Sequence, residues 1–169
     1  YNTVDISERT LREVCLPPFK AAFEADAQTV MTSFNEISGV PSTSNSFLLK
    51  TVLRDEWQMN GVVVSDYNAI GELIHHGVAE DLREAARLSI LAGVDIDMDS
   101  GAYSRYLAEL VQSGEVPMEV LDQSVCRILR LKLALGLFEQ PFTDENLAEQ
   151  VILNADHREL ALEVAQQSM

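Results

Sequence analysis

Acidic residues that end short apolar runs carry most of the potential chemistry in this sequence. Asp66 directly follows the run Gly61-Val62-Val63-Val64-Ser65, and Tyr67 follows Asp66. A carboxylate can attack or stabilise an oxocarbenium-like carbon, and an aromatic ring can stack on the apolar face of a sugar. Asp66 and Tyr67 therefore fit carbohydrate chemistry, although a carboxylate that caps a helix starting near Ala69 explains Asp66 equally well.

Glu36 is a second candidate carboxylate, because it follows another apolar run, 29–34. Asn35-Glu36 is similar to the Asn-Glu pair of some barrel glycosidases, in which the glutamate is a general acid. A solvated carboxylate on a loop is the simpler interpretation, since Ile37-Ser38-Gly39 follows and indicates a mobile segment.

An acidic triplet, Asp95-x-Asp97-x-Asp99, begins like a calcium-binding loop. Its sixth position is Ser100 where such loops need Gly, and its twelfth is Tyr106 where they need Glu. The sequence therefore argues against calcium, and we expect these aspartates to cap the next helix.

Other metal and cofactor signals are weak. His75 and His76 are adjacent, so on a helix they diverge and fit a surface pair better than one metal site. Cys15 and Cys126 are too few and too far apart for a disulfide framework or a zinc site. Because phosphate-binding and nucleophile-elbow motifs are also missing, we expect neither a metal nor a cofactor.

Composition excludes several classes of protein. The 169 residues carry a formal net charge of −15, which argues against nucleic acid as a partner. The unbroken apolar runs are far shorter than the ~20 residues of a membrane span, and no signal peptide is visible.

The elements that position these residues alternate along the chain. We expect strands over 29–34, 61–67 and 94–98, whose starts at Val30, Val62 and Val94 are 32 residues apart. Three consecutive valines indicate a strand covered on both faces, as in a parallel sheet. We expect helices over 7–25, with a break at Pro17-Pro18, and over 45–57, 69–76, 81–92, 102–113 and 117–135.

The predicted fold class is therefore α/β with a parallel sheet. Three strands cannot close a barrel, and a (β/α)8 barrel needs about 250 residues. We therefore expect an excerpt of a longer fold, with a linker over 137–155 and a helix over 156–169 that begins something further.

Several motifs, in order and spacing, resemble glycoside hydrolase family 3 over nearly the whole chain. They are Thr29–Asn35, Gly39–Pro41, Leu49–Trp57, Gly61–Asp66 and Ala92–Met98, extended by Asp5–Phe19 and Val125–Phe138. The stretch Asn68–Gly77 is most similar to β-glucosidases of the bacterial periplasmic and secreted type.

The resemblance implies the C-terminal half of a (β/α)8 barrel over 1–136, an interdomain linker over 137–155, and the start of a following α/β sandwich domain over 156–169. It implies that Asp66 is the catalytic nucleophile. Met31 matches a residue beside the sugar, and Tyr67 holds a position often taken by Trp. Phe34 stands where many members have Tyr, so a hydroxyl contact to the sugar or to the nucleophile is missing.

The implied function is a retaining exo-acting β-glucosidase that removes terminal non-reducing β-D-glucosyl residues. A β-xylosidase or broad β-glycosidase of the same family is the alternative, and a non-catalytic carbohydrate-binding or interaction module is a third. The implied partners are an oligosaccharide or glycoside substrate and the remaining segments of the same enzyme, without nucleic acid or membrane. The implied location is periplasmic or secreted. Since the acid/base and several sugar-binding residues fall outside these 169 residues, we expect the chain alone to be inactive.

Overall fold

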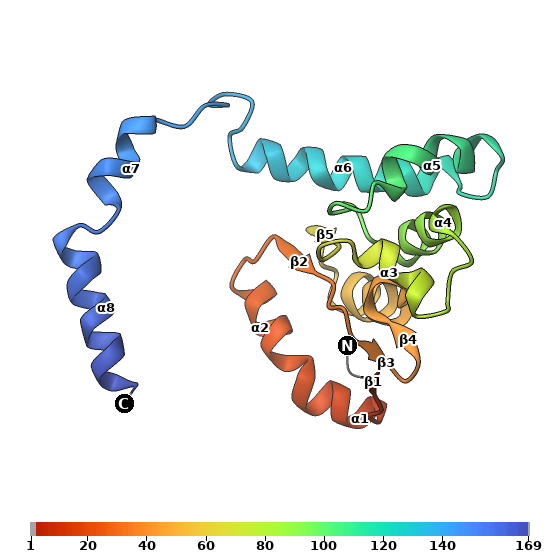
Figure 1. The fold of residues 1–169 in the computed structure, drawn as a ribbon, viewed down its shortest axis with the longest axis horizontal. Helices are drawn as coiled ribbons and strands as arrows, with labels where there is room; N and C mark the ends of the chain where they lie inside the picture. Colours follow the sequence, from red (N-terminus) through yellow and green to blue (C-terminus); the bar gives the residue numbers. More distant parts are fainter. Residues whose placement is uncertain (1–2, 169) are drawn as a thin grey trace. The chain divides into compact units, whose positions relative to one another are not determined.

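The computed structural model describes residues 3–168 and divides the chain into two compact units, Tyr1–Lys132 and Leu133–Met169. Figure 1 traces the chain from its N-terminal strands to helix α8. Among the described residues, no helix is both long and apolar enough to cross a bilayer. Each unit is described separately below.

A parallel sheet organises the first unit. Strand β2 (Thr29–Met31) pairs in parallel with β5 (Val62–Val64), which places Met31 opposite Val64. Val64 in turn forms a parallel bridge to Ile96. The three predicted runs thus lie side by side in one direction, which confirms the α/β fold class.

The strands are shorter than predicted, and the expected strand 94–98 is reduced to the bridge at Ile96. Asp95 N–H and Ile96 N–H both donate to the Val63 carbonyl, at 2.8 and 3.1 Å. Two donors on one acceptor interrupt the regular alternation of a ladder. The segment 94–98 therefore bends at Val63 and does not continue as a regular strand beside β5.

A second small sheet occupies a region that the sequence assigns to a loop. Strand β3 (Glu36–Ile37) pairs in parallel with β1 (Thr3–Val4) and antiparallel with β4 (Val40–Pro41). Ser38 and Gly39 connect β3 to β4 with φ of 52° and 80°, the left-handed conformation of a tight hairpin turn. The 3₁₀-helix η2 (Ser42–Ser44) follows.

The first helical segment breaks at Pro17, as predicted. Helix α1 (Glu8–Thr10) and the π-helix η1 (Leu11–Cys15) precede α2 (Pro17–Glu24), and Pro17 lies in the first turn of α2, where its missing N–H costs little. The predicted helix 45–57 is the π-helix η3 (Phe47–Glu56). Asn45 Oδ1 accepts from Leu48 N–H at 3.1 Å, so the Asn45 side chain caps the start of this segment.

The remaining predicted helices of the first unit are present with similar bounds. They are α3 (Ala69–His75), α4 (Leu82–Ala92), α5 (Ala102–Gln112) and α6 (Met118–Ala134). These helices and η3 pack a core whose largest fully buried side chains include Val63, Ile70, Leu73, Ile90, Val94, Leu110 and Val116. Because Val63 lies in that core, β5 is a fixed support for the residues that follow it.

The second unit contains α7 (Glu145–Val151) and α8 (Ala155–Gln167). Helix α7 lies within the predicted linker, and α8 matches the predicted helix 156–169, whose last residue is outside the described range. Neither helix buries a side chain in this structure. The assignment of 1–136 to a half-barrel, 137–155 to a linker and 156–169 to a further domain stays a prediction.

Candidate functional site

The carboxyl ends of the parallel strands place the candidate residues at one edge of the sheet. Met31 is the last residue of β2 and is 47% exposed. Thr32 N–H donates to the Val64 carbonyl at 3.0 Å, so the two chains remain side by side just before Asp66. This pairing brings Met31 and the segment that carries Asp66 to the same edge.

Asp66 follows β5 after one buried residue, and its side chain is half-buried. Its carboxylate accepts from Tyr67 N–H at 2.7 Å. Helix α3 is preceded by Asn68 in a left-handed conformation, and Ala69 N–H bonds to the backbone carbonyl of Asp66 at 3.0 Å. The alternative in which the Asp66 carboxylate caps this helix is therefore wrong, because that carboxylate faces its own neighbour and not the helix amides.

The segment 96–98 holds the backbone on both sides of Asp66. Ser65 N–H donates to the Ile96 carbonyl at 2.9 Å, and Met98 N–H donates to Ser65 Oγ at 2.8 Å. Beyond Asp66, Asn68 N–H donates to the Met98 carbonyl at 2.8 Å. The candidate carboxylate is thus attached to a backbone with little freedom to shift.

Tyr67 presents its ring to solvent and is 63% exposed. Its hydroxyl bonds to the Asp99 carboxylate, and this bond, with the negative charge of Asp99, raises the pKa of Tyr67. An exposed ring can offer a face to a sugar. Asp99 itself has φ of 75°, an uncommon conformation for a residue with a side chain.

The expected capping role of the acidic triplet holds for Asp97. Asp97 Oδ1 accepts from Ser100 N–H and Oδ2 from Tyr103 N–H, at 3.2 and 3.1 Å. The expectation is wrong for Asp95, whose side chain turns into the protein. No group of three or more metal-binding side chains is arranged for an ion anywhere in residues 3–168.

Asp95 is a buried ion-pair centre that sequence reasoning missed. Its Oδ1 accepts from Arg127 Nε and Nη2 at 2.9 and 2.7 Å, and its Oδ2 accepts from Arg54 Nη2 at 3.0 Å and Val63 N–H at 2.8 Å. Burial lowers the pKa of Arg54, and Asp95 opposes that effect. The available signal was an aspartate inside an apolar run, which needs a partner when buried.

Glu36 is neither a solvated loop residue nor part of this edge. It lies on β3, where Oε1 accepts from Thr3 Oγ1 at 2.8 Å and Oε2 is 3.5 Å from His76 Nδ1. Its side chain and that of His76 are only 19 and 16% exposed, so the expected surface pair of histidines is wrong for His76. Phe34, the third expected substrate contact, is half-buried.

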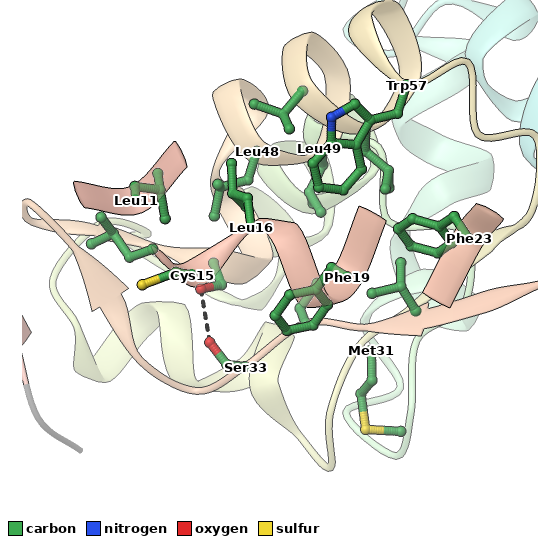
Figure 2. Close-up of a pocket in the computed structure, with 16 residues that line it drawn as sticks. Leu11, Cys15, Leu16, Phe19, Phe23, Met31, Ser33, Leu48, Leu49 and Trp57 are labelled. Atoms are coloured by element: carbon green, nitrogen blue, oxygen red, sulfur yellow. Dashed lines mark hydrogen bonds between the residues drawn. The ribbon is translucent and has the colours of Figure 1, made fainter. Parts of the chain in front are cut away.

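A cavity of about 230 Å³ lies among the helices η1, α2 and η3 and the end of β2, and Met31 is one of its lining residues (Figure 2). Its lining is largely apolar, with Phe19, Leu48 and Trp57 among its walls. Figure 2 draws Met31 among these lining residues, with its side chain extending away from Phe19 and Trp57. The cavity lacks the charged side chains that glycosidic chemistry needs, and Asp66 is not among its lining residues.

Comparisons with known proteins agree on one family. The profile of the glycosyl hydrolase family 3 N terminal domain matches residues 1–131. A periplasmic beta-glucosidase of Salmonella typhimurium is 44% identical over 174 residues, which cover 100% of this chain and 23% of that protein. A beta-xylosidase of Formosa agariphila is 40% identical and covers 98% of this chain and 24% of its own length.

Solved structures give the same result. The crystal structure of a beta-glucosidase from Listeria innocua in complex with glucose has a TM-score of 0.90 at 42% identity, over 94% of this chain and 22% of that one. The chain therefore spans about a quarter or less of the proteins that it matches.

Proposed function

Because this chain belongs to glycosyl hydrolase family 3, we propose that it forms part of a retaining exo-acting β-glucosidase. The observation that carries the proposal is the position of Asp66, half-buried at the carboxyl end of a parallel strand and braced on both sides by 96–98. Catalytic residues of (β/α)8 barrels lie at that end of their strands.

In this mechanism Asp66 attacks the anomeric carbon of the terminal sugar, and the bond to the departing oxygen breaks. Water then hydrolyses the covalent glycosyl-enzyme, and two inversions give net retention. Retaining chemistry needs a second carboxyl group about 5–5.5 Å away as acid and base. We assign that group to segments outside these 169 residues, because Glu36 bonds within the β1–β3–β4 sheet.

The substrate is a small β-glucoside or oligosaccharide, held in part by Met31, Phe34 and Tyr67. Exposure of Met31 and Tyr67 at the edge that carries Asp66 supports this role for them. The relatives include a periplasmic beta-glucosidase, and one related crystal structure is of a complex with laminaribiose. We accordingly place the enzyme in the periplasm or outside the cell.

β-Xylosidase activity is the second candidate, because a beta-xylosidase is 40% identical to the chain. Residues that distinguish the two sugars are expected mainly outside this chain. A panel of aryl β-D-glucosides and β-D-xylosides, assayed with the full-length enzyme, separates the two activities by their kcat/KM ratio.

The test of the nucleophile is Asp66→Asn in the full-length enzyme. Turnover should vanish while the circular dichroism spectrum stays unchanged, because an amide cannot form the glycosyl ester. Asp55→Asn, at an exposed carboxylate of η3, is the matched control and should keep full activity. Full activity in Asp66→Asn would remove Asp66 from the mechanism.

The 169-residue chain alone should not hydrolyse an aryl glucoside, because it lacks the acid/base residue. Hydrolysis by the pure chain that Asp66→Asn abolishes would contradict the assignment of that residue to other segments.

A further inference from the structure

We propose that Ser65 is a positioning residue for Asp66: its buried hydroxyl fixes the backbone from which the carboxylate projects. The inference rests on the proposed function, in which Asp66 is the nucleophile. Ser65 does not touch the substrate in this scheme. It acts through the next peptide unit.

The hydroxyl of Ser65 continues the strand pairing past the point where the backbone ladder ends. The parallel bridge between Val64 and Ile96 and the bond from Ser65 N–H to Ile96 are the last regular contacts before the site. Met98 N–H is then received by Ser65 Oγ at 2.8 Å, in the place of a backbone carbonyl. The Ser65 side chain thus supplies, one residue before Asp66, the acceptor that a backbone carbonyl supplies in a regular ladder.

Residues 94–98 are themselves anchored to neighbouring elements, so the bond from Met98 N–H to Ser65 Oγ can fix the position of Ser65. Asp97 ties the segment to the first turn of α5 through Tyr103 N–H, and to the residues just before that helix through Ser100 N–H. The Tyr103 hydroxyl donates to the Val94 carbonyl at 2.9 Å, which holds the start of the same segment. Met98 N–H is therefore a fixed donor for Ser65.

Loss of the Ser65 hydroxyl should let the 65–68 turn shift, although Asn68 would still bond to Met98. Nucleophilic attack demands near-contact distance and alignment, and a displacement of about 1 Å can cost about 100-fold in rate. Substrate affinity depends on many other contacts and should change far less. The expected signature is a slower chemical step at nearly constant KM.

Ser89 provides a matched control inside the same core. Ser65 and Ser89 are both 0% exposed. Ser89 Oγ has no hydrogen-bond partner among residues 3–168, whereas Ser65 Oγ accepts from Met98. Ser89→Ala thus removes a buried hydroxyl without breaking a bond, and it isolates the effect of burial from that of positioning.

The experiment uses the full-length enzyme and 2-deoxy-2-fluoro-β-D-glucosyl fluoride. The nucleophile's oxygen forms a bond to the anomeric carbon, fluoride leaves with the electron pair of the C–F bond, and the resulting glycosyl-enzyme hydrolyses slowly enough to be isolated. Peptide mass spectrometry locates the label, and its rate of formation reports the attack itself. Steady-state kcat and KM are measured alongside with an aryl glucoside.

Wild-type enzyme should be labelled at Asp66. Ser65→Ala should be labelled at the same residue at least about tenfold more slowly, with an equal fall in kcat and KM within about threefold of wild type. Ser89→Ala should match wild type in both rates. If Ser65→Ala does not fold, Ser65→Cys keeps a side chain there with a larger atom that is a weaker acceptor, and it should be slowed in the same manner.

Labelling of folded Ser65→Ala, or of Ser65→Cys, at the wild-type rate would overturn the positioning role, even if the thermal midpoint falls. An equal slowing in Ser89→Ala would also overturn it. A wild-type enzyme labelled at another carboxylate, or not labelled, would instead overturn the proposed function, so the two failures are distinguishable.

Discussion

Replacing Asp95 with alanine removes the acceptor of four hydrogen bonds in the core of the first unit. Oδ2 receives Val63 N–H and Arg54 Nη2, and Oδ1 receives two donors of Arg127. The Asp95 side chain is 0% exposed, and those of Arg54 and Arg127 are 16 and 17% exposed. Water can therefore replace only part of what the carboxylate provides.

The expected loss of unfolding free energy is about 3–5 kcal/mol, the usual cost of breaking a buried ion pair from one side. The unsatisfied Val63 N–H, alone worth about 1–3 kcal/mol, lies within that range and is not added to it. Since a domain is stable by about 5–15 kcal/mol, Asp95→Ala should remove a large part of the total.

Arg127→Met is the informative companion, because it leaves Asp95 bonded to Arg54 and Val63. It should cost less than Asp95→Ala, about 1.5–3 kcal/mol for the lost charged hydrogen bonds. Glu56→Gln weakens the exposed pair with Arg12 and should leave the unfolding midpoint close to that of wild type.

Urea unfolding of the 169-residue chain measures these differences, with the fluorescence of Trp57, its single tryptophan, as the probe. A loss below about 1 kcal/mol for Asp95→Ala, the range of exposed pairs, would refute the view that this carboxylate is a structural centre. If Arg127→Met lost as much unfolding free energy as Asp95→Ala, the remaining bonds of Asp95 to Arg54 and Val63 would contribute nothing to stability.

Two further predictions concern the residues around β5 and the site. Gly61→Ala should destabilise the chain by about 1–3 kcal/mol in the same urea assay, because a Cβ there would overlap the backbone carbonyl oxygen of Gln28; wild-type stability would contradict that close approach. Asp99→Gly should lower the pKa of Tyr67 toward its ordinary value, since it removes both the hydrogen bond and the negative charge. Because the raised pKa favours the protonated phenol in the folded state, this contribution to stability is present below about pH 10 and is lost as the pH rises further. The difference in phenolate absorbance between the chain and its Tyr67→Phe variant isolates that titration, and an unchanged pKa in Asp99→Gly would contradict the assigned cause.

Sequence reasoning succeeded where the signal is local. The unbroken valines of 62–64 predict a covered parallel strand, and Pro17-Pro18 predicts a helix break, because both depend on neighbouring residues alone. The same logic places Asp66 at a strand end. It could not separate a helix cap from a free carboxylate there, since that depends on the left-handed turn at Asn68.

Side-chain contacts between residues far apart in the sequence could not be predicted. Asp95 is 41 residues from Arg54 and 32 from Arg127, and no periodicity within one element reports such contacts. Glu36 likewise becomes a structural residue only because the folded chain brings Thr3 and His76 to it. The assignment of Asp66 as nucleophile came from resemblance, which adds what spacing alone does not contain.

The π-helical winding of η3 has a consequence for insertions and deletions. Arg54 lies in the last turn of η3, and its guanidinium reaches Asp95 and the Gly61 carbonyl from that one angular position. One residue added or removed between Asn45 and Arg54 would rotate that side chain by roughly a quarter of a turn about the helix axis. Exposed positions on η3 can therefore vary in residue type, whereas the length of the segment is constrained by the contacts of Arg54.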